Sequence, residues 1–308
     1  MVSDLTECLN PLMFNSLFYI AFLLLIAVIP SKSQPLPSCN MYQFTVSEVG
    51  GQFRLRNPKF LTAFNKEGYN NQPSFINDDL VYFTTNYYEK GQTEIASMDL
   101  FERKLRRISY TSESEYSPTA MPENRKFSCV RVEKDGKTQS LSVFPLDGMA
   151  YAQRYLPTIS NIGYHCWLSD TKVALFLING DSGNSLAVVD IETEQKQFVT
   201  DNVGRCIKTD RNGLLFFIDK LGQDWFLKSY DDKTNRIKLI ARMPDEVEDF
   251  ELLNDGSFLA GKGSLLLKLN PEKDLNWSEV KDLSSFGLKN ITRIAKNKKH
   301  LIIVDQAM

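Results

Sequence analysis

The sequence predicts an all-β protein, a six-bladed β-propeller built from four-stranded antiparallel blades. The first observation is a repeat, because acidic or amide residues at predicted turns recur at intervals of 45, 47, 40, 45 and 42 residues. These positions are Asp78, Glu123, Asp170, Asp210, Asp255 and Asn297. A period of about 40 to 50 residues is typical of propeller blades. The second observation is that short apolar strands fill every repeat, while no long segment keeps a helical period.

Each repeat has the same internal order of strands. A short apolar strand is followed by a polar turn, a second apolar strand, a loop and a third, alternating strand. The third strands are predicted at 93–100, 139–148, 184–191, 224–231 and 263–270. Fourth strands follow as LRRISY, AQRYLP, QKQFVT, IKLIAR and SEVKDL. Runs rich in Val, Ile, Phe and Tyr between Asn, Asp and Gly indicate strands joined by hairpins.

The two ends of the chain are predicted to share one blade. Segment 291–306 carries only the first two strands of a repeat, and segment 42–62 carries an alternating strand and its successor. The predicted blades are 71–111, 115–158, 162–200, 204–242, 248–288, and 291–308 joined with 40–66. Pairing the ends in this way leaves no open sheet edge in the ring. A β-sandwich with coincidental spacing is the alternative.

The amino-terminal segment predicts export. An unbroken apolar run, Leu17–Ile29, is followed by a proline and small residues, which is typical of a secretory signal cut after Ser33. The predicted parts are therefore a signal peptide over 1–33 and the propeller over 34–308, with a periplasmic or cell-surface location. No transmembrane segment is expected after the signal is removed. Two alternatives stay open, an uncleaved anchor and a lipid anchor at Cys39.

The charge of the mature chain argues against nucleic acid as a partner. The removed part holds Asp4, Glu7 and Lys32, so 36 − 1 = 35 basic and 38 − 2 = 36 acidic residues remain, a net charge of −1. No strong field of either sign and no long run of like charges is left, and nucleic-acid-binding surfaces need a basic patch.

Four cysteines remain in the mature chain, at positions 39, 129, 166 and 206. Their spacings of 90, 37 and 40 residues match no compact metal motif and no dense disulfide framework. Cys166 and Cys206 each fall four residues before a turn acid, so they occupy equivalent places in adjacent blades. Equivalent side chains in a ring point in the same rotational sense, so we expect two free thiols rather than a disulfide.

The repeat beginning at GYNNQPSFINDDLVYF resembles the TolB-like, WD40-like propeller repeat proteins. The matching residues are Pro73, Ser74, Phe75, Asp78, Ile95, Met98 and Asp99. The segment FRLRNPKFLTAFNKEGYNNQPSF is also similar to secreted members from Bacteroidota-type bacteria. The resemblance implies a six-bladed fold, export and a binding role. Only a few residues separate the predicted cleavage site from the first strand, so the mixed α/β domain of true TolB is not expected.

The opening corner of each repeat is the predicted binding site. These corners precede the first strand of a blade, which in a propeller lies nearest the axis, so their side chains would ring one mouth of the central channel. The candidate residues are Tyr69, Asn71, Gln72, Glu115, Tyr116, Tyr164, His165, Arg205, Glu248 and Arg293. Mixed aromatic and hydrogen-bonding groups suit recognition. The same residue types also satisfy turn backbones.

No catalytic residue, cofactor or metal site is predicted from motifs. The two histidines lie far apart, and no HExxH, Walker loop or calcium loop occurs. The favoured function is a non-catalytic exported module that binds a protein, peptide or glycan at the cell envelope, in an oligomeric state left open. The alternative is a propeller hydrolase or lyase acting on a sugar or lactone. Convergence of Glu115, His165 and Glu248 on one point, at metal-coordination distance, would favour this alternative.

Overall fold

The computed structural model describes residues 36–49, 52–122, 125–147 and 152–307. The predicted signal peptide, residues 1–33, lies outside the described residues. Residues Leu36–Met308 form one compact unit. Within the described ranges, no helix is long and apolar enough to cross a membrane.

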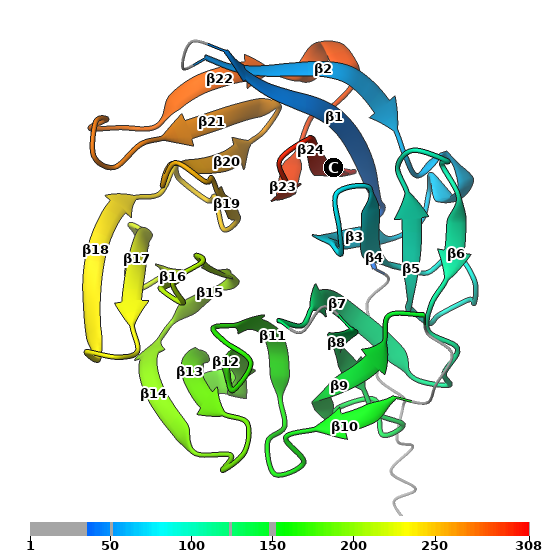
Figure 1. Cartoon of the computed structure of the whole chain (residues 1–308), viewed down its shortest axis with the longest axis vertical. Helices are drawn as coiled ribbons and strands as arrows, with labels where there is room; N and C mark the ends of the chain where they lie inside the picture. Colours follow the sequence, from blue (N-terminus) through cyan, green and yellow to red (C-terminus); the bar gives the residue numbers. More distant parts are fainter. Residues whose placement is uncertain (1–35, 50–51, 123–124, 148–151, 308) are drawn as a thin grey trace, which may run out of the picture. The chain divides into compact units, whose positions relative to one another are not determined.

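The described residues form six four-stranded antiparallel sheets arranged in a ring, as Figure 1 shows. The six-bladed propeller predicted from the repeat is therefore confirmed. The strands nearest the centre of the ring are β3, β7, β11, β15, β19 and β23. In the first five blades the chain then runs outward through the second, third and fourth strands before it crosses to the next blade.

The first three blades contain the following strands, in order from the centre of the ring outward. Blade 1 contains β3 (Asn70–Phe75), β4 (Leu80–Thr85), β5 (Glu94–Asp99) and β6 (Leu105–Arg107). Blade 2 contains β7 (Ser114–Ala120), β8 (Lys126–Val132), β9 (Gln139–Pro145) and β10 (Gln153–Tyr155). Blade 3 contains β11 (Ile162–Trp167), β12 (Lys172–Ile178), β13 (Asn184–Asp190) and β14 (Lys196–Asp201).

The remaining blades follow the same plan. Blade 4 contains β15 (Val203–Thr209), β16 (Leu215–Asp219), β17 (Phe226–Asp231) and β18 (Arg236–Arg242). Blade 5 contains β19 (Phe250–Leu252), β20 (Phe258–Lys262), β21 (Leu265–Leu269) and β22 (Ser278–Asp282). Blade 6 contains β23 (Ile291–Lys296), β24 (His300–Gln306), β1 (Cys39–Val49) and β2 (Gln52–Phe60). Short 3-10 helices are η1 (Ala63–Asn65), η2 (Gly180–Ser182) and η3 (Ser284–Phe286).

Blade 6 joins the two ends of the described chain. Strand β1 pairs antiparallel with β24, in a register that runs from Cys39 opposite Gln306 to Thr45 opposite His300. The pairing joins two halves of a blade, so β1 and β24, which would otherwise be the edge strands of these halves, each gain a partner. The predicted pairing of the amino- and carboxyl-terminal strands is confirmed.

Burial explains why the middle strands read as nearly continuous apolar runs. Both faces of each blade pack on neighbouring blades, and among the described residues one hydrophobic cluster lies at each of the six interfaces. Every residue of β16 is buried as a result, whereas the outer strand β18 is mostly exposed. Burial of both faces removes the period-2 alternation that marks a half-exposed strand.

Five of the six innermost strands contain β-bulges, which were not predicted from the sequence. The register against the second strand shifts between Asn71 and Ser74, Tyr116 and Thr119, Ile162 and Tyr164, Val203 and Ile207, and Ile291 and Arg293. Gln72 and Ser117 occupy equivalent bulges with positive φ angles of 57° and 53°. A bulge bends its strand and re-aims the side chains beside it, so these irregularities determine what faces the channel.

Candidate functional site

Residues on or next to the innermost strand of every blade line a cavity of about 150 Å³, which we name the channel cavity. Its polar lining residues are Gln72, Ser74, Ser117, Thr119, Tyr164, His165, Arg205, Lys208, Asp249 and Arg293. Five of the ten residues predicted for the channel mouth therefore meet at one cavity. These five are Gln72, Tyr164, His165, Arg205 and Arg293.

Arg205 and Arg293 bring two guanidinium groups to this cavity from blades 4 and 6. Arg205 Nη2 donates a hydrogen bond to the backbone oxygen of Thr292 at 3.2 Å, which places Arg205 next to Arg293. Arg293 Nη2 donates to the Tyr164 hydroxyl at 2.8 Å, and its guanidinium carbon lies 5.0 Å from the centre of the Tyr164 ring. The hydrogen bond and the cation–π contact hold Arg293 across the channel against blade 3.

His165 lines the cavity as a neutral, buried imidazole. Its Nε2 lies 2.6 Å from Ser128 Oγ, which also accepts a hydrogen bond from Trp167 Nε1 at 2.9 Å. The Ser128 hydroxyl also donates to the backbone oxygen of Thr119 at 3.4 Å. Nδ1 is buried and has no partner. Burial lowers the pKa of His165 to about 3, so the ring is uncharged at neutral pH.

Gln72 and Ser117 connect blades 1 and 2 at the cavity. Gln72 Oε1 accepts hydrogen bonds from Thr84 Oγ1 at 2.8 Å and from the backbone nitrogen of Ser117 at 2.9 Å. The Ser117 hydroxyl oxygen is buried without a partner. Gln72 therefore acts as a bridge between bulges, while Ser117 keeps its hydrogen-bonding capacity.

Tyr69, Asn71 and Tyr116 do not line the cavity, although they were predicted to do so. Tyr69 is buried in the hydrophobic cluster between blades 6 and 1, and its ring packs edge-on against Tyr116 with centroids 6.4 Å apart. Asn71 is also buried, and its Nδ2 donates to Cys39 Sγ at 3.5 Å. Asn71 and Tyr116 each stand at the start of a register shift, where a bulge re-aims the neighbouring side chains.

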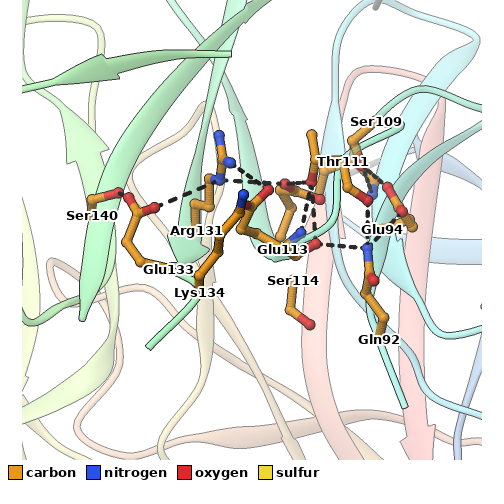
Figure 2. Close-up of polar contacts among 12 residues, drawn as sticks. Gln92, Glu94, Ser109, Thr111, Glu113, Ser114, Arg131, Glu133, Lys134 and Ser140 are labelled. Carbon is orange, nitrogen blue, oxygen red and sulfur yellow. Dashed lines mark hydrogen bonds and ion pairs between the residues drawn. The ribbon is translucent and has the colours of Figure 1, made fainter. Parts of the chain in front are cut away.

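Glu115 was predicted at the channel mouth, but the structure places it in a buried acid cluster between blades 1 and 2. The cluster comprises Glu94, Glu113, Glu115 and Glu133 and their partners, most of which Figure 2 labels. Glu115 has no exposed surface, accepts a hydrogen bond from Thr111 Oγ1, and lies 3.9 Å from Arg131 Nε. The prediction failed because Glu115 points into the interface rather than toward the axis.

The acid cluster holds its carboxyl groups in different protonation states. Burial raises the pKa of Glu115 to about 8 and also raises that of Glu94. Burial acts in the same direction on Glu113, but Ser112 and Arg131 outweigh it and lower the pKa of Glu113. Figure 2 shows Arg131 directed at Glu113, the partner with which it forms an ion pair. Two buried atoms of the cluster, Glu115 Oε2 and Arg131 Nε, have no hydrogen-bond partner.

Glu248 lies neither in the channel cavity nor in the acid cluster, and it has its own set of partners. Its Oε1 accepts hydrogen bonds from the backbone nitrogen of Arg205 at 3.0 Å and from Lys220 Nζ at 3.2 Å. Glu115, His165 and Glu248 thus face different partners and do not converge on one point, which is the arrangement that would have favoured the hydrolase or lyase. In the part of the chain that the structure describes, no group of three His, Cys, Asp or Glu side chains could hold a metal ion.

Two charged residues at the cavity were not predicted from the sequence. Lys208 Nζ donates to Glu251 Oε2 at 2.8 Å, and Asp249 Oδ1 accepts from the backbone nitrogen of Ile294 at 2.9 Å. Burial raises the pKa of Asp249 against the opposing effect of Arg293 and Lys208. Asp249 directly follows the predicted residue Glu248, and Lys208 lies three residues after the predicted residue Arg205. Both are close enough in sequence to a predicted residue that a wider selection around each one would have included them.

Larger grooves lie at the turns between the first and second strands of the blades. A cavity of about 440 Å³ between blades 4 and 5 is lined in part by apolar residues such as Leu214, Phe216 and Phe258. Another of about 780 Å³ lies between blades 3 and 4, beside Asp170 and Asp232. Both are large enough for a peptide segment or a sugar, unlike the channel cavity.

The thiols of Cys166 and Cys206 are free, as predicted. Cys166 Sγ lies 3.5 Å from Thr209 Oγ1, and Cys206 Sγ donates to the backbone oxygen of Phe250 at 3.3 Å. Each thiol thus contacts the innermost strand of the next blade, in the same rotational sense. Cys39, the alternative site for a lipid anchor, begins β1 with its side chain buried in the core.

Comparison with solved structures places this arrangement among known propellers. No protein-family profile and no curated protein matches the sequence. A TolB-like protein from Agrobacterium tumefaciens aligns with a TM-score of 0.65 at 8% identity, over 89% of this chain and 99% of that one. TolB from Acinetobacter baumannii aligns with a TM-score of 0.57 at 9% identity, over 86% of this chain and 64% of that one.

The fold is that of the TolB-like propellers. An oligogalacturonate lyase in complex with manganese shares it with a TM-score of 0.54 at 11% identity, and the alignment covers 86% of each chain. Since binding proteins and enzymes occur on the same fold, the fold alone decides nothing about activity, and function must be argued from the site.

Proposed function

We propose that the protein is a non-catalytic, exported propeller that binds a protein, peptide or glycan partner at the cell envelope through its channel. The observation that carries this proposal is the channel cavity, where Tyr164, Arg205 and Arg293 provide an aromatic ring and two cations at one place. Aromatic residues and arginine are the side chains most enriched at binding interfaces. The apolar run near the amino terminus supports export.

The structure offers less support for a hydrolase or lyase. That candidate draws on the shared fold of the oligogalacturonate lyase and on His165, whose Nδ1 is unpartnered. However, His165 is neutral, and Glu115 and Glu248 are held by separate partners. A volume of about 150 Å³ is also below the roughly 300 Å³ at which ligand pockets usually begin. One functional group of a partner fits this space better than a whole substrate.

Affinity capture with channel variants tests the proposal. The purified protein is incubated with envelope extracts of its own host, and co-eluting proteins and glycans are identified by mass spectrometry. We expect Arg205→Gln and Tyr164→Phe to lose a partner that the wild type retains. Arg242→Gln is the matched control, because Arg242 is exposed, lies on the outer strand β18 and pairs with Asp224 and Asp245.

Three results would contradict the proposal in different ways. A partner retained by both channel variants would move the binding site to another surface, with the grooves between blades 3, 4 and 5 as the next place to test. A partner lost equally in Arg242→Gln would indicate general charge attraction. Capture of no partner, together with turnover of a sugar or lactone, would favour the enzyme.

A further inference from the structure

Neither guanidinium at the channel cavity forms a hydrogen bond with a carboxylate. Each has one long ion pair instead: Glu248 Oε2 lies 3.9 Å from Arg205 Nε, and Asp249 Oδ2 lies 3.7 Å from Arg293 Nη1. The Nε atoms of both arginines are buried and have no hydrogen-bond partner. Two cations therefore share one cavity with much of their hydrogen-bonding capacity unused.

The two neighbouring acids, Glu248 and Asp249, accept their hydrogen bonds from other groups. Glu248 is bound by Lys220 and by the backbone of Arg205, and Asp249 is held by the backbone of Ile294. Lys208, the third cation of the cavity, is already paired with Glu251. The side chains of Arg205 and Arg293 are only 32% and 12% exposed, so water solvates them incompletely. Removing a charge from water is costly unless it is paired.

The size of the cavity and the shape of a guanidinium group restrict which chemical group of a ligand can bind Arg205 and Arg293. A volume of about 150 Å³ is below the roughly 300 Å³ at which ligand pockets usually begin. The cavity therefore suits one small functional group better than a whole ligand. A guanidinium group can donate two parallel hydrogen bonds to the two oxygens of one carboxylate. Asp249 also lines the cavity, and when it is ionised it opposes a doubly charged anion such as phosphate more than a singly charged carboxylate.

We propose that Arg205 and Arg293 bind a carboxylate group in the channel cavity, with the Tyr164 hydroxyl as an additional donor. The Tyr164 oxygen accepts from Arg293, so its own proton is free for the ligand. The proposal rests on the proposed function, because it names the chemical group through which the partner enters the channel. The group is either a free small carboxylate or the carboxyl terminus of a peptide.

Isothermal titration calorimetry distinguishes these sources. Acetate, acetamide, inorganic phosphate, triglycine and triglycinamide are each titrated into the full protein and into Arg205→Gln, Arg293→Gln and the control Arg242→Gln. We expect acetate to bind the wild type and the control, and at least tenfold more weakly to each channel variant. Acetamide, which has the same shape without the charge, should not bind. Circular dichroism checks the folding of each variant. If Arg293→Gln does not fold, the test depends on Arg205→Gln, because the Arg205 side chain is partly exposed and its replacement disturbs the core less.

Each outcome supports or overturns the carboxylate site. Binding of triglycine but not of its amide supports a peptide terminus, and binding of acetate without triglycine supports a small free carboxylate. Equal binding of acetamide, tighter binding of phosphate, or unchanged acetate affinity in Arg205→Gln overturns it. If the captured partner depends on Arg205 while neither acetate nor triglycine binds, the carboxylate site is wrong and the proposed function still stands.

Discussion

Glu115 is a carboxyl side chain with no exposed surface, and its surroundings determine its charge. Thr111 donates to one oxygen, the other has no hydrogen-bond partner, and Arg131 is shared with Glu113. Because burial raises its pKa to about 8, the group is mostly protonated at neutral pH in the folded protein. In the unfolded chain the same group is ionised above a pH of about 4.3.

The resulting prediction concerns stability against pH. Between about pH 5 and 8 the folded state holds a proton at Glu115 that the unfolded state has released, so unfolding becomes easier as pH rises. In Glu115→Gln this contribution is absent, and the difference in unfolding free energy from the wild type should change by up to about 1.4 kcal/mol per pH unit. Urea unfolding at about pH 5, 6, 7 and 8 measures this difference across the titration range. Parallel curves for the two proteins would show that Glu115 is ionised when folded.

The blades stack closely enough that some strand positions have no room for a side chain. A Cβ added at Gly261 on β20 would lie 2.2 Å from Ile291 Cγ2 and 2.6 Å from Ile291 Cβ, on β23 of the next blade. At Gly163 on β11 the closest atom is instead Phe176 Cδ1, at 2.8 Å. The first contact involves an atom fixed to the backbone, whereas the second involves a ring that can rotate.

Gly261→Ala should therefore destabilise the protein more than Gly163→Ala. We expect Gly261→Ala to lower the unfolding free energy by about 1–3 kcal/mol, the usual effect of overpacking a core. Chemical denaturation of both variants measures the difference, and Gly163→Ala serves as the matched control because it makes the same change on a strand of another blade. Equal stability of Gly261→Ala and the wild type would mean that blades 5 and 6 have room for the added methyl group.

At the scale of the whole molecule, the sequence repeat predicts the ring of six blades, whereas the bulges in the innermost strands determine which side chains line the channel cavity. Turn residues such as Asp78 and Asp210 have a regular spacing, so the number of blades and the shared blade 6 followed from the sequence. The positions of Asn71 and Glu115 did not, because bulges and interface packing decide which way a side chain points. Arg205 and Arg293 were predicted as rim residues, but their proximity depends on the three-dimensional ring.

The central claim is that the closed ring encloses a binding site for an anionic group. The most direct test is a crystal structure of the purified protein, from crystals grown in sodium acetate. We predict density for one planar carboxylate within hydrogen-bonding distance of Arg205 and Arg293, and its absence in crystals of Arg205→Gln grown in the same way. Density showing Arg205 bonded to Glu248 and Arg293 bonded to Asp249, with no anion between them, would contradict the account.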